Sequence, residues 1–501
     1  MPNSSLLREP ATKDKTQAAL WGGRCTKDDM IGDLLAKSGS ADRQDYHAQW
    51  MAAAFALYGL MAVSLLAINV PPFQVTDETS HFQRAAQVAQ GDIIGTRFSD
   101  VGANGSPQVT AGGPLDPALI EAITPFNSVA FYPEVRATRR LWAPDIHWSD
   151  KLALQSFPTV NYPPFFYVPS AIGVLVGREA GLSVVETLTV SRLLTGLTAV
   201  ALGAMAIAIA GGAAAWIFTI LTLPMSLSLI ASASQDAMHL GCSALAGALL
   251  MRALRWPSAR NGTLITGLTV MLGLVAMARP AYGALATLPL AIIKMPWRWR
   301  ILATAAVAAC VTIWWTIVAA TTLTEIGADV GADAATQLAR LRDDPLLAAS
   351  AMWGALTQYW PAYSMSFIGQ LGWLDTTLPI SYHIAAKTML GMAALTAMLE
   401  IRGERISVGS RLVIAAGLLL SVTGIFVLLY LSWTTPGRPI VEGVQGRYFL
   451  PLALAGTALL PALGHSRLAS LHRPLLIMVV MFPVVSLAVV MRAIVLRYYL
   501  G

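Results

Sequence analysis

The sequence has little charge and almost no cysteine. Only 12% of its 501 residues are charged, about half of the share found in soluble domains. Its three cysteines have no paired or metal-ligand spacing, so we predict neither a disulfide framework nor a zinc site from them. A phosphate-binding loop of the G-x-x-x-x-G-K type is also absent, so nucleotide-driven chemistry is not indicated.

Long apolar runs take the place of the missing charge. Hydrophobic residues make up 55% of the chain, and runs of about 20 residues, the length of a membrane-spanning helix, recur along most of it. We therefore predict an all-α polytopic membrane protein with about eleven spans (ten to thirteen). The expected spans are 50–69, 188–210, 213–231, 237–253, two halves of 264–293, 301–320, 384–400, 412–432, 448–464 and 475–496.

The spans divide the chain into four predicted regions. We expect a disordered cytoplasmic tail at 1–49 and a membrane module at 50–320, which includes a long polar loop at 70–187. A second external loop is expected at 321–383, followed by C-terminal spans at 384–501.

The distribution of charge predicts the orientation of the spans. The loops at 251–262, 294–300, 401–411 and 465–473 together hold eleven Arg or Lys and one acidic residue. The loop at 321–383 holds six acidic residues and two arginines. Basic loops stay in the cytoplasm, so we expect a cytoplasmic N-terminus and a functional site on the outer face. The net charge of +6 reflects this pattern and predicts no nucleic-acid partner.

The start of the long loop carries the first candidate site. A helix that begins near Thr76, capped by its hydroxyl, would place Asp77 and Glu78 on one face with His81, close to Arg84. Two carboxylates and a histidine can take a proton from a hydroxyl nucleophile. The alternative is that both acids only stabilise the positive end of the helix.

Other charges lie close to apolar spans. Asp236 lies between two apolar spans on the predicted outer side, and Arg279 interrupts thirty otherwise apolar residues. An arginine at that depth needs an anionic partner, either a carboxylate or a lipid phosphate. Arg438, Arg447 and Tyr448 mark a second basic site on the predicted outer face. A polar loop for Asp236 and membrane anchors for the arginines remain open as alternatives.

Two further segments have the composition of binding surfaces. The segment 162–176 is apolar and has prolines at its start, which is typical of a short interfacial helix that begins after Tyr162. The loop at 321–383 is rich in aromatic residues, among them Trp373, which is followed by Asp375. Aromatic faces bind sugar rings, although an interfacial aromatic belt has the same composition.

The order of these motifs resembles the GT-C superfamily of membrane glycosyltransferases that use polyprenyl-phosphate sugars. More narrowly, it is similar to a bacterial membrane family catalogued as a domain of unknown function. The motifs are Asp77-Glu78 with His81, Asn161-Tyr162-Pro163-Pro164, Gly372-Trp373-Leu374-Asp375 and Gln445-Gly446-Arg447-Tyr448-Phe449-Leu450-Pro451. Threonines flank Asp77-Glu78 where the narrower family often has a proline, which leaves open which acid faces the substrate.

The resemblance implies a GT-C-like fold and transfer of sugar from a polyprenyl-phosphate-linked donor to a glycan or lipid acceptor. The site would face the exterior of a bacterial inner membrane, and a divalent cation is the one cofactor left open. The implied roles are catalysis by Asp77, Glu78, His81 and Asp236, donor-phosphate binding by Arg279, Arg447, Arg438 and Tyr448, and sugar or acceptor binding by Tyr162, Trp373, Asp375 and Arg84. The competing interpretations are a transporter or flippase of lipid-linked saccharides, and a saccharide polymerase or ligase.

Overall fold

A computed structural model of the chain describes residues 27–101, 107–137, 145–149, 151–256, 261–324, 331–463 and 470–500, with side chains from Asp45 onward. The chain divides into two units, 1–43 and 44–501. Helix α1 (Lys27–Asn69) begins within the tail that we predicted to be disordered, and residues 1–26 of that tail lie outside the described residues.

Six helices in the described part of the chain are long and apolar enough to cross a membrane, and a bent pair would make a seventh span. A helix of 25 residues is about 37 Å long, which exceeds the roughly 30 Å hydrocarbon core of a bilayer. The six are residues Asp45–Asn69 of α1, α6 (Val184–Ile209), α9 (Gln235–Arg255), α11 (Trp297–Thr321), α15 (Val408–Ser432) and α17 (His472–Tyr498). Multiple spans are therefore confirmed, whereas the number eleven stays a prediction.

Several predicted spans are shorter or broken. The expected 213–231 span is α7 (Ala214–Leu221) and α8 (Pro224–Ile230), which follow the turn η4 (Gly211–Ala213) and bend by 79° at the break. The 264–293 segment breaks at Arg279-Pro280, as expected, and the 384–400 segment is helical. The remaining elements are α10 (Gly262–Ala278), η6 (Pro280–Ala291), α14 (Ile380–Glu400), η8 (Gly446–Phe449), α16 (Leu450–Ala455) and η9 (Gly456–Leu459).

The predicted loops are structured, and the fold is not entirely helical. The first loop contains an antiparallel sheet in the order β1-β2-β3, in which Thr96 pairs with Gly112 and Gly112 with Ser156. Its elements are α2 (Glu78–Ala89), β1 (Thr96–Val101), β2 (Pro107–Leu115), α3 (Pro117–Ile123), η1 (Thr124–Ser128), β3 (Ala153–Ser156), η2 (Pro158–Asn161), η3 (Pro164–Tyr167) and α5 (Val168–Glu179). The second loop contains α12 (Ala334–Asp343), α13 (Leu347–Ile368) and the hairpin β4 (Gln370–Leu371) and β5 (Thr376–Thr377).

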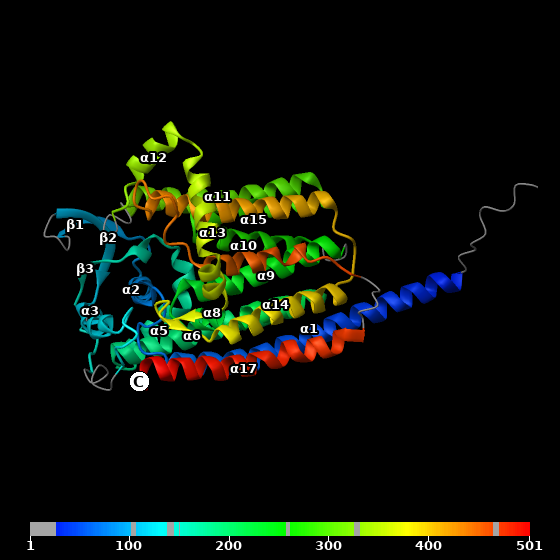
Figure 1. The fold of residues 1–501 in the computed structure, drawn as a ribbon, viewed down its shortest axis with the longest axis horizontal. Coiled ribbons are helices and arrows are strands. Elements are labelled where there is room, and N and C mark those ends of the chain that lie inside the picture. Colours follow the sequence, from blue (N-terminus) through cyan, green and yellow to red (C-terminus); the bar gives the residue numbers. More distant parts are fainter. Residues whose placement is uncertain are drawn as a thin grey trace, which may run out of the picture. The chain divides into compact units, whose positions relative to one another are not determined.

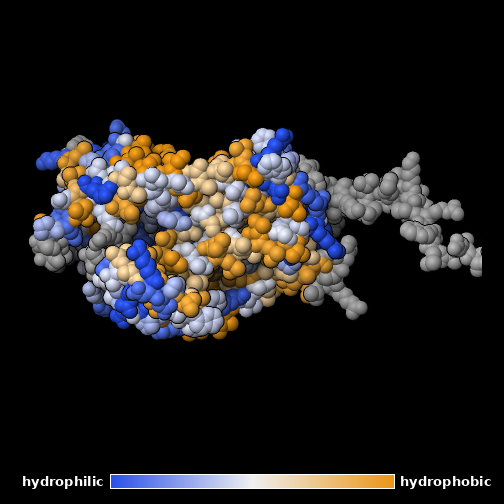
Figure 2. All heavy atoms as spheres, turned by 90° about the horizontal axis from the view of Figure 1, so that it is seen from above, coloured by the Kyte–Doolittle hydropathy of each residue, from blue (hydrophilic) through white to orange (hydrophobic). Residues whose placement is uncertain are grey.

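The long helices of the second unit lie side by side, with the sheet, α2 and α3 at one end of them (Figure 1). Many large apolar side chains on these helices point outward, such as Leu57, Leu419 and Met481. Figure 2 shows hydrophobic surface over the middle of the helices and hydrophilic surface toward both ends. This arrangement is expected of helices whose outer faces contact lipid.

A buried ion pair holds the first loop against the helices. Arg192 on α6 and Glu78 at the start of α2 have side chains that are 2% and 0% exposed, and Nε of Arg192 donates to Oε1 of Glu78 at 2.8 Å. The same carboxylate oxygen accepts the backbone N–H of Ala233 at 3.2 Å. The other guanidinium nitrogens donate to carbonyl oxygens at the end of α1 and just after it, those of Ala67, Val70 and Pro71. One pair thereby joins four segments.

We expect Glu78→Gln to destabilise the folded protein by about 3–5 kcal/mol, because it leaves the guanidinium of Arg192 buried without a counter-charge. The measurement is denaturant unfolding of the purified protein in detergent. The matched control is Glu442→Gln, which removes the partner of Arg438, a side chain that is 61% exposed. Equal free energies of unfolding for the two variants would contradict the expected contribution of the buried pair to stability.

Candidate functional site

Asp77 lies in a strained turn between α1 and α2. Phe73 and Asp77, near the two ends of this turn, have φ values of 63° and 61°, a left-handed conformation that non-glycine residues adopt uncommonly. Such conformations cost of order 1–3 kcal/mol each and persist only where the surroundings enforce them. The turn therefore needs external support.

That support comes from the Gly372-Trp373-Leu374-Asp375 turn. Oγ1 of Thr76 donates to the carbonyl of Gly372 at 2.7 Å, and Nε1 of Trp373 donates to the carbonyl of Phe73 at 3.0 Å. Leu374 also has a positive φ of 63°. Trp373 thus positions the turn that carries Asp77, and its indole N–H is already engaged.

The helix start differs from the prediction. Helix α2 begins at Glu78, and the residue at its N-cap is Asp77, whose side chain makes no capping hydrogen bond. The prediction that the Thr76 hydroxyl caps this helix was wrong, because that hydroxyl bonds across to the 372–375 turn. The left-handed backbone of Asp77 leaves its carboxylate free to contact another part of the chain.

Four charged side chains meet beside this turn, and we call them the charge cluster: Asp77, Arg447, Asp236 and Arg279. Nη2 of Arg447 lies 2.5 Å from Oδ2 of Asp77, and its Nη1 lies 3.4 Å from Oδ2 of Asp236. Nη2 of Arg279 lies 3.1 Å from Oδ1 of Asp236. Acids and arginines alternate, so their formal charges cancel.

Each member of the charge cluster comes from a different element. Asp77 precedes α2, Asp236 lies in the first turn of α9, Arg279 follows α10, and Arg447 lies in η8. The backbone N–H of Asp236 donates to the hydroxyl of the N-cap residue Ser234. The helix dipole favours a carboxylate in this first turn. The cluster is therefore built by tertiary packing.

Aromatic rings line the charge cluster. The guanidinium carbons of Arg279 and Arg447 lie 4.5 Å and 5.3 Å from the ring centre of Tyr448, within range of cation–π attraction. The ring of Tyr162 is 5.9 Å from Arg279. Both tyrosines that the sequence singled out thus contact the arginines.

Exposure differs sharply within the cluster. The side chain of Asp77 is 43% exposed, whereas that of Arg447 is 1% exposed. Burial alone would raise the pKa of Asp77, but the charge and hydrogen bond of Arg447 outweigh it and hold this pKa below its usual value. Asp77 is therefore ionised at neutral pH and is the one accessible acid of the cluster.

His81 lies behind the cluster and is buried. Its Nδ1 is 2.7 Å from the Tyr167 hydroxyl, and its ring stacks on Tyr162 with the ring centres 5.9 Å apart. Burial lowers the pKa of His81 to about 4, so it is neutral at physiological pH. His81 therefore packs against Tyr162 and Tyr167 and adds no charge to the site.

A small cavity opens next to the charge cluster. One side is apolar and the other is charged. Its lining residues are Leu229, Asp236, His239, Leu240, Arg279, Tyr282, Arg447, Tyr448 and Pro451. Among the described residues, Nε of Arg279 has no hydrogen-bond partner although it is buried. The site thus keeps one unused cationic donor.

Two predicted acids lie in other ion pairs. Glu78 binds Arg192, and Asp375 lies 2.7 Å from Nη2 of the buried Arg497. Sequence reasoning missed both arginines, although each lies within an apolar helix. The argument that singled out Arg279, that an arginine at membrane depth needs an anion, would have found them.

Two predicted arginines are also elsewhere. Arg84 is fully buried and donates to the carbonyls of Ile93 and Tyr162 at 2.8 Å and 3.1 Å, so it fixes the segment that carries Tyr162. Arg438 is exposed and lies 3.7 Å from Glu442, outside the charge cluster.

Comparison with known proteins gives one finding for the chain as a whole. No curated protein and no solved structure matches it. Residues 60–455 match the family described as a predicted membrane protein (DUF2142), a range that includes all four members of the charge cluster. This match covers most of the sequence, so the chain belongs to this family and is a multi-pass membrane protein.

Proposed function

We propose that this protein is a GT-C-like glycosyltransferase that moves a sugar from a polyprenyl-phosphate-linked donor to an acceptor hydroxyl on the outer face of a bacterial inner membrane. The observation that carries the proposal is the charge cluster, in which one accessible carboxylate, Asp77, rests on a buried arginine, Arg447. The outer location rests on the unequal charge of the loops.

In this proposal the donor phosphate binds at the small cavity, which widens to admit it. Arg279 and Arg447 point into it, and the unused Nε of Arg279 can donate to a phosphate oxygen. The apolar wall formed by Leu229, Leu240 and Pro451 suits the hydrocarbon end of a lipid-linked donor. Both guanidinium groups would stabilise the charge that develops on the leaving phosphate.

Asp77 would act as the general base. The proton of the acceptor hydroxyl passes to the Asp77 carboxylate while the acceptor oxygen bonds to the anomeric carbon. The bond from that carbon to the phosphate oxygen breaks, and the polyprenyl phosphate leaves with the electron pair, which inverts the anomeric carbon. A carboxylate paired with arginine is a weak base, so the pairing must loosen first. A phosphate that draws Arg447 toward itself would raise the pKa of Asp77 and activate it.

One observation favours a transporter of lipid-linked saccharides as the second candidate. The break between α7 and α8 bends the chain by 79°, and broken helices are typical of transporter binding sites. A transporter would move the intact donor and form no new glycosidic bond, so product analysis separates the two functions.

We expect Asp77→Asn to abolish sugar transfer. Asn tolerates a left-handed backbone, so this variant keeps the turn and loses only the proton acceptor. The measurement is transfer of labelled sugar from polyprenyl-phosphate donors in membranes that contain equal amounts of each variant. Glu442→Gln, an acid paired with the exposed Arg438, serves as the control and should retain activity. Full activity of Asp77→Asn would exclude Asp77 as the base.

We expect Arg279→Ala to weaken binding of a polyprenyl monophosphate by about 10- to 100-fold, the loss of one charge-assisted hydrogen bond. Binding is measured by titrating this lipid into the purified protein in nanodiscs. Arg438→Ala is the matched control, because it removes an arginine outside the charge cluster. If both variants bind the polyprenyl monophosphate with equal affinity, Arg279 is a membrane anchor and not part of the donor site.

The rate of transfer should not depend on the protonation of His81 near neutral pH. Its pKa of about 4 keeps it neutral above about pH 5, and the lowered pKa of Asp77 keeps that carboxylate ionised over the same range. Activity should therefore stay constant through the neutral range and decline only in acid, where Asp77 begins to be protonated. A pH–rate profile that declines near pH 6.5 and loses this decline in His81→Gln would contradict this assignment.

A further inference from the structure

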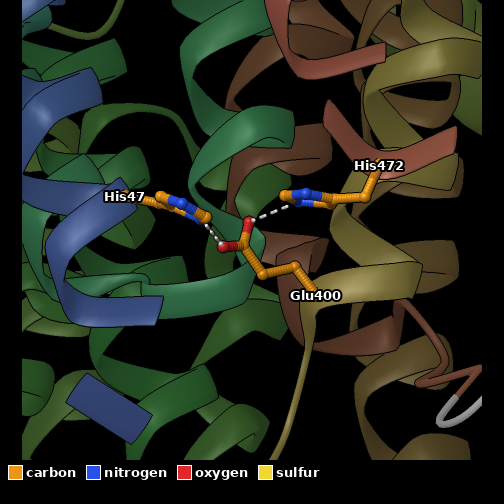
Figure 3. Close-up of side chains that lie close together, drawn as sticks. All are labelled: His47, Glu400 and His472. Atoms are coloured by element: carbon orange, nitrogen blue, oxygen red, sulfur yellow. Dashed lines mark hydrogen bonds and ion pairs between the residues drawn. The ribbon is translucent and has the colours of Figure 1, made fainter. Parts of the chain in front are cut away.

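A second cluster of titratable side chains lies at the end of the helices opposite Asp77. It consists of His47 on α1, Glu400 at the end of α14 and His472 at the start of α17, and Figure 3 shows the two imidazole rings on either side of the carboxylate. His47 lies 22 residues before Asn69, the last residue of α1, so about 33 Å of helix separates it from the turn that carries Asp77. The charge cluster and its proposed function do not involve these residues.

The ligand atoms of the three side chains converge. Nδ1 of His47 lies 2.6 Å from Oε1 of Glu400, and Nε2 of His472 lies 3.2 Å from Oε2. One nitrogen or oxygen of each residue lies within 4.8 Å of the others. The contact to His472 lacks hydrogen-bond geometry, and its buried Nε2 has no hydrogen-bond partner among the residues that the structure describes.

We propose that His47, Glu400 and His472 bind a divalent transition-metal ion of the Zn²⁺ class. Zinc bonds of about 2.0–2.2 Å place the ligands of a tetrahedral site about 3.4 Å apart. Nε2 of His472 and Nδ1 of His47 face different oxygens of Glu400, at 3.2 Å and 2.6 Å, so the carboxylate turns to offer one oxygen to an ion that both histidines hold. Two imidazoles and a carboxylate select Zn²⁺ and related ions over Mg²⁺ or Ca²⁺, which prefer oxygen ligands.

The position of the site indicates what the metal does. His47, Glu400 and His472 come from three helices, and His47 and His472 lie outside the range that matches the family, 60–455. A metal ion there ties the middle of α1 and the beginning of α17 to the end of α14. Three protein ligands leave the fourth tetrahedral position to water. We therefore expect the bound ion to stabilise the packing of these helices.

The test uses the full chain, purified in detergent, stripped with a chelator and then titrated with Zn²⁺ alone. We expect about one tightly bound equivalent per chain by elemental analysis, and a higher melting temperature when Zn²⁺ is present. His47→Ala and His472→Ala should each lower the affinity at least about tenfold and abolish the rise in melting temperature. His147→Ala is the control, because His147 lies 3.1 Å from Asp145 but is exposed and belongs to no ligand group among the described residues.

A second measurement needs no variant and so does not depend on how the variants fold. Co²⁺ added to the stripped wild-type protein should give the visible absorption of a tetrahedral site, and Zn²⁺ should displace it. No such absorption, or equal Zn²⁺ uptake by the wild type and the His47→Ala/His472→Ala double variant, would overturn the proposal. The three residues would then form only a hydrogen-bonded contact between helices.

Discussion

A charge that leaves water needs an opposite charge or a set of hydrogen-bond acceptors, and this constraint organises the end of the helices that carries Asp77. Arg192, Arg279, Arg447 and Arg497 all lie largely buried near that end, and each contacts a carboxylate. Burying a single unpaired ion costs several kcal/mol, so loss of any of these contacts would lower the stability of the fold substantially. Because the partners come from distant parts of the sequence, the pairs also determine how the loops dock.

The neighbouring acids Asp77 and Glu78 differ in role because their arginine partners differ in position. Glu78 is fully buried, binds Arg192 and the backbone of Ala233, and has no access to a substrate. Asp77 is 43% exposed and shares its arginine, Arg447, with Asp236. One residue of the pair therefore holds the turn in place, and the other is available at its surface. The sequence motif alone left both roles open to either acid.

Sequence reasoning found the parts of the site more readily than their arrangement. Asp236 and Arg279 were singled out because charge is rare beside or within apolar spans, Asp77 because of its spacing from His81, and Arg447 as a basic residue on the predicted outer face. Their contacts depend on four elements that meet only in the tertiary structure, and no local pattern encodes that meeting. The sheet was missed for a different reason. β1 is exposed along nearly its whole length and β3 has only four residues, so neither has the alternation that identifies a strand.

The alternation of charge in the cluster also explains how two arginines can lie buried beside one cavity. Arg279 and Arg447 both border one small cavity, and without Asp236 between them their charges would repel at low dielectric. The two carboxylates neutralise the pair and allow both arginines to stay buried. In the proposed reaction the donor phosphate replaces a carboxylate as the partner of Arg447, and the carboxylate that is released is the accessible Asp77. Binding of the donor and activation of the base would then be a single exchange of ion pairs, so that Asp77 becomes a competent base only when a sugar is present to receive the acceptor.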